Sequence, residues 1–320
     1  MLLVERHIIN NTKSQFQAID RLCLLSKNLY NYANYVIKKH YEETGHFLRY
    51  REVEKQLKEA NQTDYRALPN NSSQQILMLL DKNWKSFFSL IRLFKKDKKK
   101  LNGCPQPPKF KHKEKGRNII VFTYVQMQIK NGYVKFPKKA NLPKLKTKVE
   151  KFQQVRIIPQ KSCYIIEIIY EKEERLLTEN KNYAAIDLGV NNLATVTFNT
   201  NIKPVVVNGR PLKSINQYYN KRKAKIQLQL EKNHKKKFSN RLSKLTFKRN
   251  NKVSDYIHKS TKRILNLCIE NNISKVVVGY NKEWKQNVSL GSKNNQSFVN
   301  IPYYKILQQL EYKCKLNGIS

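Results

Sequence analysis

The apolar residues of the first hundred positions recur at helical spacing. Residues 13–41, 49–61 and 68–100 each place them on one face with a period close to 3.6, which predicts three helices. We expect Ser72 or Ser73 to cap the third helix, because a serine hydroxyl can accept a backbone N–H of the first turn. The apolar stripe that we expect to form the core of this region consists of Ile76, Leu79, Leu80, Trp84, Phe87, Phe88 and Ile91.

The spacing changes to alternation after position 118. Residues 118–138 alternate apolar and polar side chains and contain Asn131-Gly132, a pair typical of a tight β-hairpin turn. Residues 152–173 predict a second pair of strands. The stretch SCYIIEIIY (162–170) is nearly uncharged, and we expect it in the centre of a sheet.

Strands alternate with helices in the second half of the chain. The stretch YAAIDLGVNNLATVTFN (183–199) predicts two strands joined at 189–192. The elements expected after them are a strand at 204–209, a pair of helices within 210–249, a helix at 254–272, a strand at 273–281 and a helix at 301–318.

These elements predict two domains that meet at the polar segment 174–182. We expect residues 1–178 to form an α+β region, with a helical bundle over about 13–100 and a small antiparallel β unit over about 118–173. Residues 179–320 are expected to form an α/β domain.

Composition adds a large positive charge. The 320 residues include 63 Lys and Arg against 23 Asp and Glu, a formal net charge of +40, and both halves of the chain are basic. Self-repulsion of this size is best explained by a polyanionic partner, with nucleic acid as the first candidate. Acidic lipid is the second, but no apolar run approaches the ~18–20 residues that span a bilayer. A lysine-rich proteome would explain lysine in place of arginine, but not the scarcity of acids.

Two segments concentrate this charge, 95–117 and 210–249, and the second contains a single acid, Glu231. Phosphate contacts dominate nucleic-acid affinity, so we expect these segments to bind the backbone. The candidate residues are Lys98, Lys99, Lys100, Lys109, Lys111, Lys221, Arg222, Lys223, Lys235, Lys236, Lys237, Lys248 and Arg249. The aromatic residues among these cations either stack on bases or belong to the core; they are Tyr30, Tyr32, Tyr35, Phe110, Tyr218 and Tyr219.

The five cysteines are far apart in the sequence, without the close CxxC pairs of a zinc knuckle. Their odd number and spacing favour free thiols in a reducing compartment. The N-terminal stretch MLLVERHIINN lacks the apolar core of a signal peptide. We therefore expect a cytoplasmic protein.

Asp187 ends an apolar run and is the candidate catalytic residue. A strand–turn–strand with one aspartate on its first strand, followed by a third strand, helices and a parallel strand, is the layout of the RNase H-like (RuvC-type) fold. Nucleases of this type need several carboxylates, because two divalent ions about 3.5–4 Å apart must hold the phosphodiester. One aspartate cannot form such a centre.

Four blocks of the second half resemble consecutive parts of the OrfB/TnpB family of transposon-encoded proteins, known as insertion-sequence transposases and related to type V CRISPR effectors. The resemblance covers about 183–319. Its blocks begin at YAAIDLGVNNLATVTFN, VNGRPLKSINQYYNKRKAKIQ, KRNNKVSDYIHKSTKRIL and NNQSFVNIPYYKILQQLEYKC. The stretches LYNYANYVI and PPKFK are similar to the helical and β wedge region of that family.

The resemblance implies an RNA-guided, Mg²⁺-dependent DNA endonuclease associated with DNA transposition, with DNA and a transposon-derived guide RNA as partners. It also admits a separate transposase of the same element as a partner. Asp187 matches the first catalytic aspartate and metal ligand of the family. The second acid usually ends the strand that here reads VVVGYN, where this chain has Val278-Gly279-Tyr280. Glu283 is the nearest substitute.

The third aspartate, the zinc ribbon and the final strands of the family would lie beyond Ser320. We therefore expect a RuvC domain that is incomplete at its C-terminus, and no zinc site in these residues. Three functions stay open: a nuclease that is complete only in a longer chain, a guided DNA-binding repressor that does not cut, and a non-functional transposon remnant.

Overall fold

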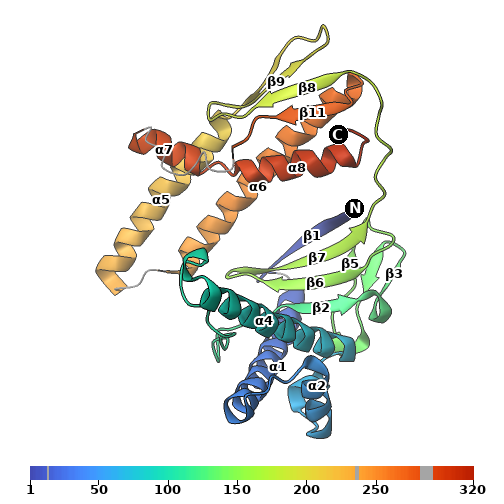
Figure 1. The fold of residues 1–320 in the computed structure, drawn as a ribbon, viewed down its shortest axis with the longest axis vertical. Helices are drawn as coiled ribbons and strands as arrows, with labels where there is room; N and C mark the ends of the chain where they lie inside the picture. Colours follow the sequence, from blue (N-terminus) through green and yellow to red (C-terminus); the bar gives the residue numbers. More distant parts are fainter. Residues whose placement is uncertain (13, 235–237, 282–290) are drawn as a thin grey trace. The chain divides into compact units, whose positions relative to one another are not determined.

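The computed structural model describes residues 1–320 except Lys13, 235–237 and 282–290 (Figure 1). Its internal contacts divide the chain into two compact units, Leu2–Glu171 and Lys172–Ser320, with Met1 assigned to the second. Each unit has its own buried apolar core. In the part of the chain that the structure describes, we find no helix with the length and apolar character of a membrane span.

The first unit contains a four-stranded antiparallel sheet. Its order is β1-β7-β6-β2, so β7 lies inside the sheet as its nearly uncharged sequence predicts. The bounds are β1 Leu2–Asn10, β2 Ile120–Thr123, β6 Gln154–Pro159 and β7 Cys163–Glu171.

The first strand, β1, has no counterpart in the sequence-based prediction. It pairs with β7 along its whole length, from Leu2 opposite Glu171 to Asn10 opposite Cys163. One face of β1 carries Leu3, Glu5, His7 and Ile9 and is the more buried of the two. The other face is more exposed and largely apolar. Because apolar residues fall on both faces, the period-2 signal is weak, and only the pairing partner makes this segment a strand.

Four helices complete the core of this unit, and three of them match the predicted ones. Trp84 is 2% exposed and lies at the centre of an aromatic cluster with Tyr41, Phe47, Phe87 and Phe88. The bounds are α1 Gln15–Thr44, α2 Tyr50–Glu59, α3 Thr63–Ala67 and α4 Asn70–Lys96.

The expected serine cap of α4 is wrong. The helix begins directly after Pro69, so Ser72 and Ser73 lie inside its first turn and are fully buried. The Ser73 hydroxyl donates to the backbone oxygen of Tyr65, 3.0 Å away, and thereby ties α4 to α3.

The hairpin predicted at Asn131-Gly132 is confirmed, although its strands are short. Both residues have positive φ, 53° and 71°, as a tight hairpin turn requires. β3 Gln128–Lys130 and β4 Tyr133–Lys135 form a separate three-stranded sheet with β5 Leu145–Lys146. The 3₁₀ turn Tyr124–Gln126 separates this sheet from β2, so the segment 118–138 contributes to two sheets.

The second unit has a mixed sheet of order β10-β9-β8-β11. β11 runs parallel to β8 and the other neighbours are antiparallel, which matches the predicted order of strands. The bounds are β8 Tyr183–Asp187, β9 Asn192–Phe198, β10 Val205–Asn208 and β11 Lys275–Val278.

Helices follow the strands of this sheet as expected, with one correction. A single helix takes the place of the helix expected at 254–272 and the second helix of the 210–249 pair. Val253 is buried in the core and Arg249 is bonded to α5. The helix therefore continues through the Asn-rich stretch between Arg249 and Val253. The short helix α7 was not predicted. The bounds are α5 Arg210–His234, α6 Asn240–Glu270, α7 Ser292–Val299 and α8 Tyr303–Lys315.

A buried lysine joins α6 and α8 in this core. Lys313 donates to the Thr261 hydroxyl at 2.6 Å and to the His258 backbone oxygen at 2.9 Å, and Thr261 donates to Gln309 at 3.0 Å. Burial lowers the pKa of Lys313 to about 8, with a smaller contribution from the charge of Lys262. The protonated amine is therefore less favourable in the folded protein than in the unfolded chain.

We expect Lys313 to make the free energy of unfolding rise with pH between about 8 and 10. In that window the unfolded chain binds the proton more tightly than the folded protein, so raising the pH relieves a cost of folding on the order of 2 kcal/mol. Urea unfolding of the wild type and of Lys313→Met at several pH values measures this difference. The stability of the wild type relative to Lys313→Met should increase with pH.

The matched control is Lys225→Met, which replaces an exposed lysine of α5. The difference in stability between Lys225→Met and the wild type should not change with pH in this window, unlike the difference between Lys313→Met and the wild type. Parallel pH profiles for the wild type and Lys313→Met would show that the Lys313 amine is not desolvated.

Candidate nucleic-acid interface and metal site

Asp187 is the last residue of β8, where two neighbouring strands end together. It pairs with Thr195 of β9 on one side. On the other side Val278 of β11 lies opposite Ile186, and the Gly279 N–H donates to the Ile186 oxygen at 3.1 Å. Because β8 and β11 are parallel, the residue level with Asp187 on the neighbouring strand is Gly279, which has no side chain.

The turn after Asp187 depends on two glycines. A Cβ on Gly189 would lie 2.8 Å from the backbone oxygen of Asn192, and one on Gly209 would lie 2.2 Å from that of Val190. The Gly209 N–H donates to the Asn191 oxygen at 2.7 Å, so the start of α5 is bonded to the β8–β9 turn. Close backbone contact therefore fixes the loop beside Asp187.

The Asp187 carboxylate is exposed and lies close enough to α8 to act on Tyr303. Burial raises the pKa of the Tyr303 phenol, and the negative charge of Asp187 raises it further. Across the described ranges, with their gaps at 13, 235–237 and 282–290, no three His, Cys, Asp or Glu side chains come together as a metal site would require. Glu283, the suggested substitute, lies outside the described residues.

This donor set fits a divalent ion poorly. Asp187 supplies one hard oxygen ligand, whereas Mg²⁺ chemistry on phosphodiesters uses several carboxylates around two ions. What the strand edge offers is one carboxylate beside an open position at Gly279.

The first basic segment is held along α1 by side-chain amides. The Asn34 amide donates to the Pro108 oxygen at 2.9 Å and accepts from the Trp84 indole at 2.9 Å. Asn31 makes two bonds to the backbone of Lys111, at 2.8 and 2.9 Å. These contacts give an irregular, proline-containing loop a fixed path without regular secondary structure of its own.

Most cations of this segment are exposed. Lys98, Lys99, Lys100 and Lys109 project into solvent. Lys111 instead is half-buried, with its ammonium 5.0 Å from the centre of the Tyr30 ring, and burial lowers its pKa. Tyr30 is 5% exposed, so it belongs to the core and is not available to stack on bases. Near this segment, the candidate aromatic residues that are exposed and available for stacking are Tyr32, Tyr35 and Phe110.

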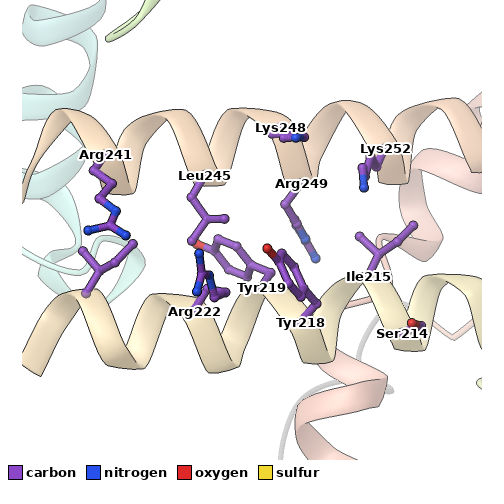
Figure 2. Close-up of a pocket in the computed structure, with 11 residues that line it drawn as sticks. Ser214, Ile215, Tyr218, Tyr219, Arg222, Arg241, Leu245, Lys248, Arg249 and Lys252 are labelled. Atoms are coloured by element: carbon purple, nitrogen blue, oxygen red, sulfur yellow. The ribbon is translucent and has the colours of Figure 1, made fainter.

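The described residues of the second basic segment lie in α5 and in the first part of α6, and a pocket of about 400 Å³ lies between these neighbouring helices. Figure 2 shows side chains from both helices pointing into the space between them. Three of the predicted nucleic-acid residues line the pocket, namely Arg222, Lys248 and Arg249. Lys221 and Lys223 lie on α5 outside its lining, and Lys235, Lys236 and Lys237 lie outside the described residues.

Sequence reasoning missed two further cations of this pocket, Arg241 and Lys252. A signal was available, because Ile215, Tyr218, Arg222 and Ile226 recur at helical spacing on α5, and Arg241, Leu245, Lys248 and Lys252 do so on α6. That the two stripes face each other could not be read from spacing alone.

Arg249 holds the two helices in place. Its guanidinium donates to Asn216 at 2.8 Å, to the Asn300 backbone oxygen at 2.9 Å and to Asn250 at 3.0 Å. It also lies 5.6 Å from the Tyr219 ring centre, and burial lowers its pKa. Its donors are engaged within the protein, and Arg222 lines the same pocket.

Comparison with known proteins agrees with this description. The chain combines a mixed α/β fold with a formal net charge of +40. Residues 167–285 match the family model OrfB_IS605, a probable transposase, which confirms the resemblance to the OrfB/TnpB family. No curated protein matches the chain.

Two solved structures align with nearly the whole chain. A cryo-EM structure of a Cas12f1–sgRNA–target DNA complex aligns over 94% of this chain and 71% of that chain, with a TM-score of 0.52 and 14% identity. A cryo-EM structure of a CRISPR-Cas12f ternary complex aligns over 95% of this chain and 70% of that chain, with a TM-score of 0.35 and 15% identity. At this identity the first of these comparisons supports a shared fold.

We expect Asn34→Leu to lower the free energy of unfolding by about 2–4 kcal/mol. It leaves the buried Trp84 indole N–H without its acceptor and removes the donor to Pro108, and each lost partner of a buried group costs roughly 1–3 kcal/mol. Urea unfolding at neutral pH measures the change.

Asn31→Ala, on the preceding turn of α1, is the matched control. It loses only the two bonds to Lys111, so it should mainly loosen the loop, with faster tryptic cleavage after Lys109 and Lys111 and a smaller change in global stability. Equal tryptic rates in Asn31→Ala and the wild type would show that the amides do not hold the loop.

Proposed function

We propose that this protein is an RNA-guided DNA-binding protein of the OrfB/TnpB type that does not cut DNA. The observation that carries the proposal is a combination of two features. The chain has a formal charge of +40, and its strand edge places Asp187 beside Gly279. The charge serves phosphate binding, and the strand edge lacks a second acid at the neighbouring position.

In this proposal residues 1–178 bind guide RNA and target duplex, and residues 179–320 form a RuvC-like domain. The sheet order β10-β9-β8-β11, with β11 parallel to β8, supports the RuvC-like assignment. The guide RNA and target DNA in the Cas12f1 complex support the choice of partners. Sequence recognition would rest on base pairing with the guide, and the protein would supply backbone contacts.

The alternative is an endonuclease, in which Asp187 is one ligand of a Mg²⁺ centre and further acids come from Glu283 or from a longer chain. The place of Asp187 at the end of β8 favours it, because that is where the family has its first aspartate. A transposon remnant without function is the third possibility. A protein that binds nucleic acid would be expected in the cytoplasm with the nucleoid.

We expect the purified protein to bind structured RNA with steep salt dependence. If six to ten phosphates are neutralised, affinity should fall by about 10³–10⁵-fold between 50 and 200 mM salt. Lys98→Gln combined with Lys99→Gln should reduce the slope of log affinity against log salt by about 1–2, as measured by fluorescence anisotropy.

The matched control is Lys38→Gln combined with Lys39→Gln, which removes the same charge from α1. These lysines are paired with Glu42 and Glu43 at 3.7 and 3.8 Å. A slope that falls equally in both double variants would show that net charge, and not the loop surface, determines the binding.

We expect no Mg²⁺-dependent cleavage of guided DNA target by the wild type, and none by Asp187→Ala. Guide-dependent nicking by the wild type that disappears in Asp187→Ala would overturn the proposal and establish the endonuclease.

Gly279→Glu tests the strand edge without relying on cleavage. A Cβ at Gly279 would lie 3.9 Å from the nearest atom, the Ile186 oxygen, so a side chain fits there. With a second carboxylate level with Asp187, Mn²⁺ binding measured by electron paramagnetic resonance should increase over the wild type. Adding Asp187→Ala to Gly279→Glu should abolish the increase.

A further inference from the structure

The pocket between α5 and α6 has the composition of a binding site and not of a packing defect. Its volume of about 400 Å³ falls in the ~300–1,000 Å³ range of small-molecule and cofactor sites. Its apolar wall comes from Ile215, Ile226 and Leu245, of which Ile226 is buried. Apolar surface of this kind between two otherwise very polar helices is not needed to bind phosphate alone.

An aromatic ring stands beside this wall. Tyr218 is 61% exposed, and the guanidinium of Arg222 lies 6.0 Å from the centre of its ring (Figure 2). A large aromatic side chain that stays exposed at a concave, cationic surface offers a π-face to a planar ligand.

The cations around the pocket are not neutralised by the protein. Among the described residues, no salt bridge involves Arg222, Arg241, Lys248 or Lys252. Glu231 is the single acid of residues 210–249, and it does not line the pocket. The site therefore combines an apolar and aromatic slot with uncompensated positive charge.

The frame of the pocket is preorganised. Arg249 is bonded to Asn216 of α5, and the hydroxyl groups of Tyr219 and Thr246 lie 3.1 Å apart across the two helices. A ligand can therefore enter without the cost of first bringing the helices together.

We propose that this pocket receives an unstacked base of single-stranded nucleic acid, with the ring on Tyr218 and the flanking phosphates on Arg222, Arg241 and Lys248. This inference rests on the proposed function and adds to it a site that distinguishes single-stranded from double-stranded nucleic acid. Bases within a duplex are stacked and cannot reach a slot between two helices, whereas a single strand can turn a base outward. RNA and DNA share this chemistry.

The test compares the full-length wild type with Tyr218→Leu. The probes are an oligothymidylate of about 12 nucleotides, within the ~4–16 nucleotides that such sites cover, its oligouridylate counterpart and an abasic oligomer with the same phosphates. Tyr218→Leu should weaken binding to the two base-containing probes by about 5- to 100-fold, because stacking on one aromatic ring contributes that much. Binding to the abasic oligomer should not change.

Three variants serve as controls. Tyr218→Phe keeps the ring and should bind like the wild type. Tyr304→Leu removes a similarly exposed tyrosine of α8, which does not line the pocket, and should have no effect. Arg222→Gln should lose more affinity for the base-containing probes than Lys225→Gln, although both remove one positive charge from α5.

Equal affinities of the wild type and Tyr218→Leu for the oligothymidylate, or an equal loss on the abasic oligomer, would overturn the base-binding pocket. Salt-dependent RNA binding would still stand in that case, and with it the proposed function. Failure of the wild type to bind any of the nucleic acids would instead remove both. Stronger binding to the oligouridylate or to the oligothymidylate would identify RNA or DNA as the natural strand.

Discussion

The parallel pairing of β11 with β8 is the constraint on which the second unit depends. It joins residues about ninety positions apart, from Tyr183 opposite Lys275 to Ile186 opposite Val278. The two strands then end at the same edge, which brings Gly279 level with Asp187. The same pairing requires a long helical connection, and α5 and α6, which make up most of it, also form the cationic pocket. The candidate metal position and the candidate base pocket thus follow from one topological feature.

Scarcity of acids shapes how this chain buries positive charge. Lys27, Lys111, Lys313 and Arg249 each have a pKa lowered chiefly by burial. Lys27, Lys313 and Arg249 bond to neutral oxygens of backbone carbonyls, a hydroxyl or amides. Neutral acceptors satisfy the donors but leave the charge in place. The fold therefore stays strongly positive, as the proposed binding of a nucleic acid would require.

Long, strongly periodic segments were predictable from the sequence, and weakly periodic ones were not. α1, α4, α8 and the strands β8 and β9 appear where their patterns predict, and Asn131-Gly132 turns as its residue types require. β1 was missed because both of its faces carry apolar residues, and α6 was divided in two because an Asn-rich stretch weakens the local helical signal. In both cases a distant partner, β7 or the core around Val253, decides the local structure.

The sequence by itself determined the positive charge of both halves, the resemblance around Asp187 and the absence of an acid in VVVGYN. These are properties of residue type and order, which folding cannot alter. Only the tertiary structure decided that Gly279 lies beside Asp187, that Tyr30 is core while Tyr218 is exposed, and that Arg222, Arg241 and Lys252 share one pocket. Such facts depend on which elements pack together, and packing is settled by burial and backbone pairing over the whole unit and not by any local pattern.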